Sequence, residues 1–204
     1  MKPKLETLAL GLFLAPPAPL AGLMVGWWLS YELLPEKWIP FGTIGGFLLG
    51  LLADLFILKK LVARAHTFPV LLWMAIFLFY AIGMFGFFMG VPVFHAALAI
   101  PAGIVIGGRL AHAAASQGQV KVTALRTSIF TSLILFLTCA ASATFALVSP
   151  STSGDLKGML GLGFEVTPLM IWGLILVGGA GLLAVNWALT EASVRLTYRF
   201  LRTA

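Results

Sequence analysis

The stretch from Phe41 to Leu58 reads FGTIGGFLLGLLADLFIL and is followed directly by Lys59 and Lys60. Asp54 is its single charged residue. A helix of this length is about 27 Å long, which is close to the thickness of about 30 Å of a bilayer's hydrocarbon core. The stretch therefore predicts a transmembrane helix that ends at a basic pair.

The composition of the whole chain agrees with this stretch. Of 204 residues, 60% are hydrophobic and 10% are charged, and the mean hydropathy is +1.04. Soluble domains carry about 25% charged residues, so a soluble fold is excluded, and so is a disordered chain. A single cysteine, Cys139, excludes a disulfide scaffold. The composition predicts an all-α, polytopic integral membrane protein.

Apolar stretches separated by polar or proline-containing segments predict six transmembrane helices. Their approximate ranges are 7–29, 41–58, 69–89, 93–111, 127–148 and 168–190. Gly90-Val91-Pro92 predicts a tight turn between the third and fourth spans, because proline cannot continue a helix. Little chain is left outside the spans, so we expect a single transmembrane domain over residues 1–204.

The basic residues predict the orientation of the chain. With a cytoplasmic N-terminus, eleven of the thirteen lysines and arginines fall on the inside, and only Lys37 and Lys157 fall outside. The positive-inside rule therefore places both termini in the cytoplasm, and we expect the protein in the cytoplasmic (inner) membrane. The basic residues are spread over four segments, which excludes a nucleic-acid partner and leaves the lipid bilayer.

Small residues recur every fourth position on three spans, and this spacing lets another helix approach closely. The rows are Gly42, Gly46, Gly50 and Asp54; His95, Ala99, Gly103, Gly107 and Ala111; and Gly22, Gly26 and Ser30. We expect these rows to face neighbouring helices. A glycine-lined pore is the alternative.

Two features predict a polar site inside the membrane. Pro16, Pro17 and Pro19 interrupt the first span, and the backbone groups that they free need partners in protein or water. Thr131, Thr138 and Ser142 belong to a hydroxyl stripe on the fifth span. Both features also have a structural interpretation, as a packed proline kink and as hydroxyls bonded to the carbonyl one turn earlier.

Asp54 and His95 are candidates for a proton or ion site, because ionisable groups are costly inside a membrane. We expect Asp54 to point into the protein. Its structural alternative is an ion pair with Arg109, which we prefer as partner, or with Lys59 or Lys60. His95 has the alternative of a packed, hydrogen-bonded histidine. The sequence contains no catalytic triad, HExxH motif or cysteine cluster, so no catalytic residue, metal or cofactor is predicted.

The longest connection, 149–168, starts with polar residues and then becomes apolar and glycine-rich. We expect no firm helix in this apolar part, and we expect residues 158–165 to cap a pocket among spans one, five and six. The pocket would open to the outer side and be lined by the proline cluster and the hydroxyl stripe. Its many hydroxyls and few charges predict a small neutral or weakly charged solute.

In size, six-span layout and cytoplasmic termini the chain is similar to the solute-binding subunits of energy-coupling-factor vitamin transporters. The resemblance is one of architecture and covers no particular residues. Our first hypothesis is a small transport protein or a solute-binding membrane subunit. The second is a structural or anchoring subunit, with other membrane subunits or a second copy as partners. The third is a membrane enzyme that acts on lipid.

Overall fold

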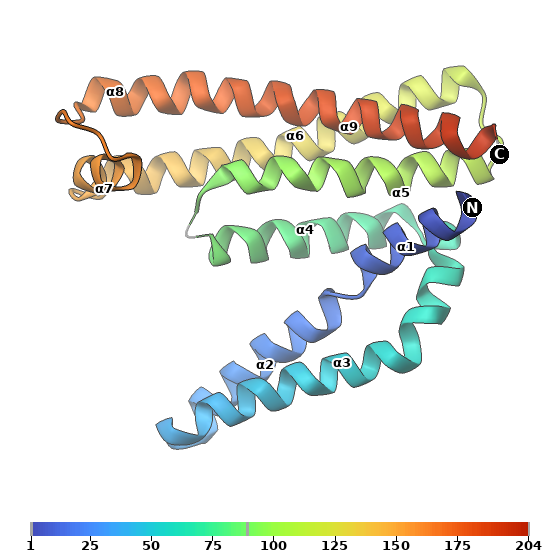
Figure 1. Cartoon of the computed structure of the whole chain (residues 1–204), viewed down its shortest axis with the longest axis horizontal. Coiled ribbons are helices and arrows are strands. Elements are labelled where there is room, and N and C mark those ends of the chain that lie inside the picture. The colour runs from blue at the N-terminus through green and yellow to red at the C-terminus, as the bar shows by residue number, and fades with distance from the viewer. Residues whose placement is uncertain (1, 89, 204) are drawn as a thin grey trace. The chain divides into compact units, whose positions relative to one another are not determined.

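The computed structural model describes residues 2–88 and 90–203, and this part of the chain is helical and contains no β-strand (Figure 1). Its first half consists of α1 (Lys2–Leu14), α2 (Pro17–Leu33), η1 (Glu36–Trp38), α3 (Ile39–Arg64), η2 (Ala65–Thr67) and α4 (Val70–Phe87). Its second half consists of η3 (Pro92–Leu98), α5 (Ala99–His112), α6 (Gln117–Val148), α7 (Thr152–Leu160), α8 (Pro168–Gly173), η4 (Leu174–Gly178) and α9 (Gly179–Arg202). The first three η elements are 3-10 turns, and η4 is a π-helical turn.

Six helical segments are long and apolar enough to cross a membrane, which confirms the all-α class and the predicted number of candidate spans. These segments are Glu6–Leu33, Glu36–Thr67, Val70–Phe87, Pro92–His112, Gln117–Val148 and Pro168–Arg202. The second, fifth and sixth segments extend beyond the predicted apolar ranges, in each case at the end where lysine and arginine residues lie. The fifth starts ten residues early because Ser116 and Gln119 form a capping box: the Gln119 N–H donates to Ser116 Oγ, and the Ser116 N–H donates to Gln119 Oε1.

The chain divides into two compact units, with the boundary inside α4. Unit 1 contains residues 1–79 together with residues 203–204, and unit 2 contains residues 80–202. Each unit has its own close helix packing. The expectation of a single transmembrane domain over the whole chain stays a prediction.

In unit 1, α2 and α3 pack side by side as an antiparallel pair (Figure 1). A Cβ atom built on Gly22 would overlap the carbonyl oxygen of Gly46, and one built on Gly26 would overlap the carbonyl oxygen of Gly42. The two backbones are therefore in direct contact, which only glycine allows. The glycine rows predicted on the first two spans are confirmed, and they face each other.

In unit 2, α9 packs against both α5 and α6. A Cβ on Gly103 of α5 would overlap the Ser193 side chain, and a Cβ at Gly107 would meet the carbonyl oxygen of Val194. Val194 is completely buried in this contact. The row predicted on the fourth span therefore also faces a helix.

The connection 149–168 contains a helix that lies mostly in its polar part and includes only residues 158–160 of the apolar part, where we expected no firm helix. α7 runs from Thr152 to Leu160 and ends at Gly161, whose φ of 60° is the left-handed conformation typical of a helix C-terminus. The side chains of Lys157 and Glu165 form an ion pair that joins α7 to the segment after it. The expectation is therefore wrong for residues 158–160, which are helical, and confirmed for residues 161–167, which are not.

Candidate functional site

The first span is broken in its apolar part. α1 ends at Leu14 and α2 begins at Pro17. Proline has no N–H, so Pro16 and Pro19 cannot donate to the carbonyl oxygens of Leu12 and Ala15, which lie four residues earlier. The predicted break or kink at the proline cluster is therefore confirmed as a short bend: Pro16 keeps helical φ and ψ angles of −61° and −30°, and its carbonyl oxygen accepts from the Leu20 N–H. The bend leaves the carbonyl oxygens of Leu12 and Ala15 without the donors four residues later that a regular helix would supply.

Asp54 lies on the face of α3 that packs against α2. A Cβ on Gly50 would overlap the carbonyl oxygen of Ala18 and the Cα atom of Pro19, so Gly50 faces the first turn of α2. Asp54 follows Gly50 by one helical turn of about 5.4 Å on the same face. Because α2 runs antiparallel to α3, this turn brings Asp54 level with the helix break.

Asp54 is buried as a residue, with 9% of it exposed, while its carboxyl oxygens keep some access to the surface. Within unit 1 it has no hydrogen bond or ion pair with a described residue. The expected inward orientation is confirmed, and the alternative pairs with Lys59 and Lys60 are not found among the described contacts. The pair with Arg109, a residue of unit 2, stays a prediction.

The hydroxyl stripe of α6 is hydrogen-bonded within the protein. Thr138 Oγ1 donates to the Ile134 carbonyl at 2.9 Å, and Ser142 Oγ lies 2.8 Å from the Thr138 carbonyl and also contacts the carbonyl of Gly90. Thr131 is 1% exposed. These bonds favour the structural interpretation of the stripe. The solute pocket draws on residues of both units and stays a prediction.

A polar cluster that the sequence analysis missed connects α6 to α9. Asn186 Nδ2 donates to Ser132 Oγ at 3.0 Å and to Thr131 Oγ1 at 3.2 Å, and Thr131 Oγ1 lies 2.9 Å from Thr190 Oγ1. Asn186 and Thr190 are at most 1% exposed. The available sequence signal was an amide side chain inside an apolar span. Interhelical hydrogen bonds of this kind hold membrane helices together.

A groove of about 520 Å³ lies between α6 and α9, beside this cluster. Its wall is mainly apolar, and its lining residues are Ile129, Ser132, Leu133, Phe136, Leu183, Ala184 and Trp187. The groove does not include Thr131, Thr138 or Ser142. Spans five and six thus form a concave surface, with a lining different from the predicted one.

His95 lies in η3 and is 2% exposed. Its Nε2 atom donates to the carbonyl oxygen of Ala81 at 2.7 Å, since a carbonyl can only accept. Its ring meets the Phe85 ring edge-on, with 6.5 Å between the ring centroids. These contacts fit the packed histidine that we gave as the alternative, and a role in ion binding stays a prediction.

Comparison of the chain with family models, with curated proteins and with solved structures finds no match.

Proposed function

We propose that this protein is a small multi-pass membrane transport protein in which Asp54 binds a proton or a monovalent cation. One observation carries the proposal: Asp54, an acidic residue that is 9% exposed and has no partner in the described part of unit 1, lies level with a break in a membrane-spanning helix. A carboxyl group inside a span costs about 3 kcal/mol on insertion scales. Such a cost is expected where the group has a function.

The chemistry of the break suits a cation. The carbonyl oxygens of Leu12 and Ala15 are acceptors without helical donors, and an ionised Asp54 adds a negative charge. Broken helices in secondary transporters bind coupling ions with unwound carbonyls and helix ends. A proton on Asp54 would turn the carboxyl group into a donor to the same carbonyls. Proton and metal-cation binding are therefore alternatives at one site.

The remaining parts of the proposal rest on the distribution of charge along the sequence. Eleven of thirteen basic residues on one side support cytoplasmic termini and a location in the cytoplasmic membrane. Few charged side chains lie within the spans, so the proposed solute is small and neutral or weakly charged.

Labelling with dicyclohexylcarbodiimide tests the site, because this reagent modifies protonated carboxyl groups in apolar surroundings. We expect labelling at Asp54, measured by mass spectrometry of the purified protein in nanodiscs, and none at the exposed Glu36. Protection by sodium at constant pH would identify a sodium site. Labelling that depends on pH alone would identify a proton site. An Asp54 that is not labelled at any pH would contradict the proposal.

Transport itself is tested with proteoliposomes on a solid-supported electrode, challenged with panels of sugars, amino acids and other small neutral solutes. We expect one panel to evoke a current that Asp54→Asn removes while the protein stays folded. The matched control is Glu36→Gln, a change of the same charge in the short turn between α2 and α3. No current from the wild-type protein with any panel would contradict the transport hypothesis.

A second candidate function is a structural subunit of a membrane complex. It is favoured by the contacts of α6, whose hydroxyls bond to protein atoms, and by an exposed apolar face of α3 that another subunit could cover. Leu55 and Phe56 on that face are 74% and 73% exposed. Native mass spectrometry after extraction into native nanodiscs tests it. Two results together would favour this structural function over transport: a stoichiometric assembly that stays intact in the Asp54→Asn variant, and no current with any solute.

A further inference from the structure

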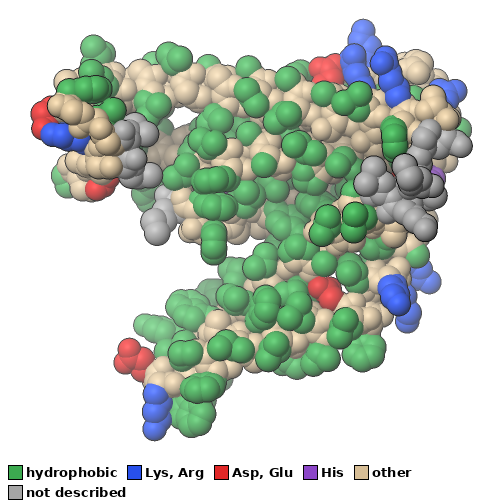
Figure 2. All heavy atoms as spheres, in the orientation of Figure 1, with side chains coloured by type: hydrophobic (Ala, Val, Ile, Leu, Met, Phe, Trp, Pro, Cys, Tyr) green, Lys and Arg blue, Asp and Glu red, His purple; other side chains and the backbone are tan. Residues whose placement is uncertain are grey.

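A basic cavity of about 320 Å³ lies at one end of unit 2, between the first turns of α6 and the last turns of α9. Its lining residues are Gln117, Val120, Lys121, Arg195, Tyr198 and Arg199. Three of these six side chains are cationic and none is acidic. Figure 2 shows Lys and Arg side chains gathered around this end of α9.

The floor of the cavity is fixed by buried contacts. Tyr198 is 1% exposed, and its hydroxyl donates to the Ala115 carbonyl at 2.6 Å. Arg202 donates to the same hydroxyl oxygen. Val120 is 3% exposed and packs in the same cluster. The cationic groups therefore surround a preformed floor.

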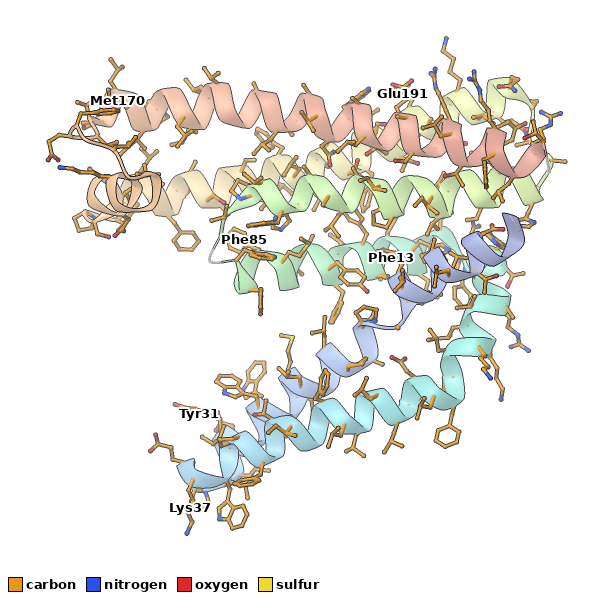
Figure 3. The ribbon with its side chains drawn as sticks, in the orientation of Figure 1. Phe13, Tyr31, Lys37, Phe85, Met170 and Glu191 are labelled. Atoms are coloured by element: carbon orange, nitrogen blue, oxygen red, sulfur yellow. The ribbon has the colours of Figure 1, made fainter. Side chains whose placement is uncertain are left out.

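The start of α6 adds to the positive potential. Ser116 caps the helix, and Gln117, the first helical residue, lines the cavity. A helix N-terminus carries a partial positive charge and N–H groups that favour anions. Arg195 also pairs with Glu191, one turn away on α9 and labelled in Figure 3, so part of the positive charge of Arg195 is already neutralised within the protein.

The residues around the cavity indicate whether the anionic group that binds there belongs to a lipid or to a soluble molecule. The fifth and sixth spans both have an end here, so the cavity lies at the level of a membrane surface. Exposed apolar side chains lie close in sequence to the lining residues: Val122 and Leu125 on α6, and Leu196 and Phe200 on α9, are 46–64% exposed. A soluble phosphate would leave these apolar side chains exposed, whereas the acyl chains of a lipid would cover them.

We infer that this cavity binds the phosphate group of an anionic phospholipid from the leaflet at the basic ends of the spans. The phosphate lies among Lys121, Arg199 and the start of α6, and the acyl chains run along the exposed faces of α6 and α9. Basic pockets between membrane helices bind anionic headgroups in this way. The inference does not depend on the transport proposal.

The test measures binding of phosphatidylglycerol to delipidated protein by native mass spectrometry, with phosphatidylcholine as the zwitterionic reference. We expect a clear preference for phosphatidylglycerol. The variant Lys121→Gln/Arg199→Gln should weaken this binding about thirtyfold, or about 2 kcal/mol at about 1 kcal/mol per basic residue. Lys121→Arg/Arg199→Lys should keep it, because the charges remain.

The matched control is Lys59→Gln/Lys60→Gln, which removes the same charge at two exposed positions on α3. It should leave phosphatidylglycerol binding within about twofold of wild type. Equal weakening by both double variants would show general attraction to charge and overturn the site. Inorganic phosphate and glycerol phosphate form the second arm: binding of either as tight as that of the lipid would overturn the lipid and leave a soluble phosphate as ligand.

Discussion

Gly22 of α2 and Gly46 of α3 are in reciprocal backbone contact: a Cβ atom on either glycine would overlap the carbonyl oxygen of the other. Each helix thus presents its backbone to its partner at the same point. Membrane helices have no hydrophobic drive to associate within lipid, so close packing of this kind supplies much of their attraction.

The contact predicts that Gly46→Leu separates α2 from α3. We expect a loss of about 3 kcal/mol, the upper part of the range for overpacking, because the added side chain meets rigid backbone. The measurement is thermal unfolding of purified protein in detergent. Gly45→Leu is the matched control, since a Cβ on Gly45 has nothing within 4 Å. Equal loss in both variants would contradict the proposed role of the contact.

The second prediction concerns the bond between Asn186 and Ser132. A double-mutant cycle with Asn186→Ala and Ser132→Ala should give a coupling free energy of about 0.6 kcal/mol and at most about 1.7, the range for hydrogen bonds between membrane helices. In the control cycle Thr144→Ala takes the place of Ser132→Ala. Among the described contacts, the exposed Thr144 hydroxyl bonds only to the Ala140 carbonyl of its own helix. Zero coupling would show that the two side chains do not act together.

Sequence patterns predicted the features of the fold that depend on local chemistry. The apolar stretches gave six spans, and the proline cluster gave the break before Pro17. Glycine spacing identified the face of α3 that contains Gly46. The sequence could not show that the glycine rows of α2 and α3 face each other, because the pairing depends on tertiary structure. The sequence analysis assigned no helix to residues 152–157, and it expected none at residues 158–160 because of the glycines in the apolar part.

The candidate site was predictable in one part only. Asp54 stands out as a charge inside an apolar stretch, and its burial agrees with that prediction. The hydroxyls of Thr138 and Ser142 gave a weaker signal, because a helix can satisfy a hydroxyl with its own carbonyls. Asn186 was missed as a partner of Thr131, because the two residues lie far apart in the sequence and meet only when α6 packs on α9.

The third prediction concerns the hydroxyl of Tyr198. Tyr198→Phe removes its bond to Ala115 and leaves a buried carbonyl oxygen without that donor. We expect a loss of about 1–3 kcal/mol, measured by thermal unfolding. Tyr31→Phe is the matched control, since Tyr31 lies near the C-terminal end of α2 and is 61% exposed (Figure 3). A larger loss in the control than in Tyr198→Phe would contradict the packing described for this cluster.

The last prediction is the orientation of the chain, read by cysteine accessibility in a Cys139→Ala background, which removes the single native thiol. Lys37 and Lys157 lie outside if the positive-inside rule holds, whereas Lys121 and Thr203 lie inside. Cysteines at the first two positions should therefore react with a membrane-impermeant maleimide in intact cells. Cysteines at the other two should react only after permeabilisation.

Six crossings require both termini on one side, so labelling of position 203 in intact cells, with position 37 protected, would invert the topology. Labelling of both 37 and 121 in intact cells would show that α3, α4 and α5 do not cross the membrane three times in sequence.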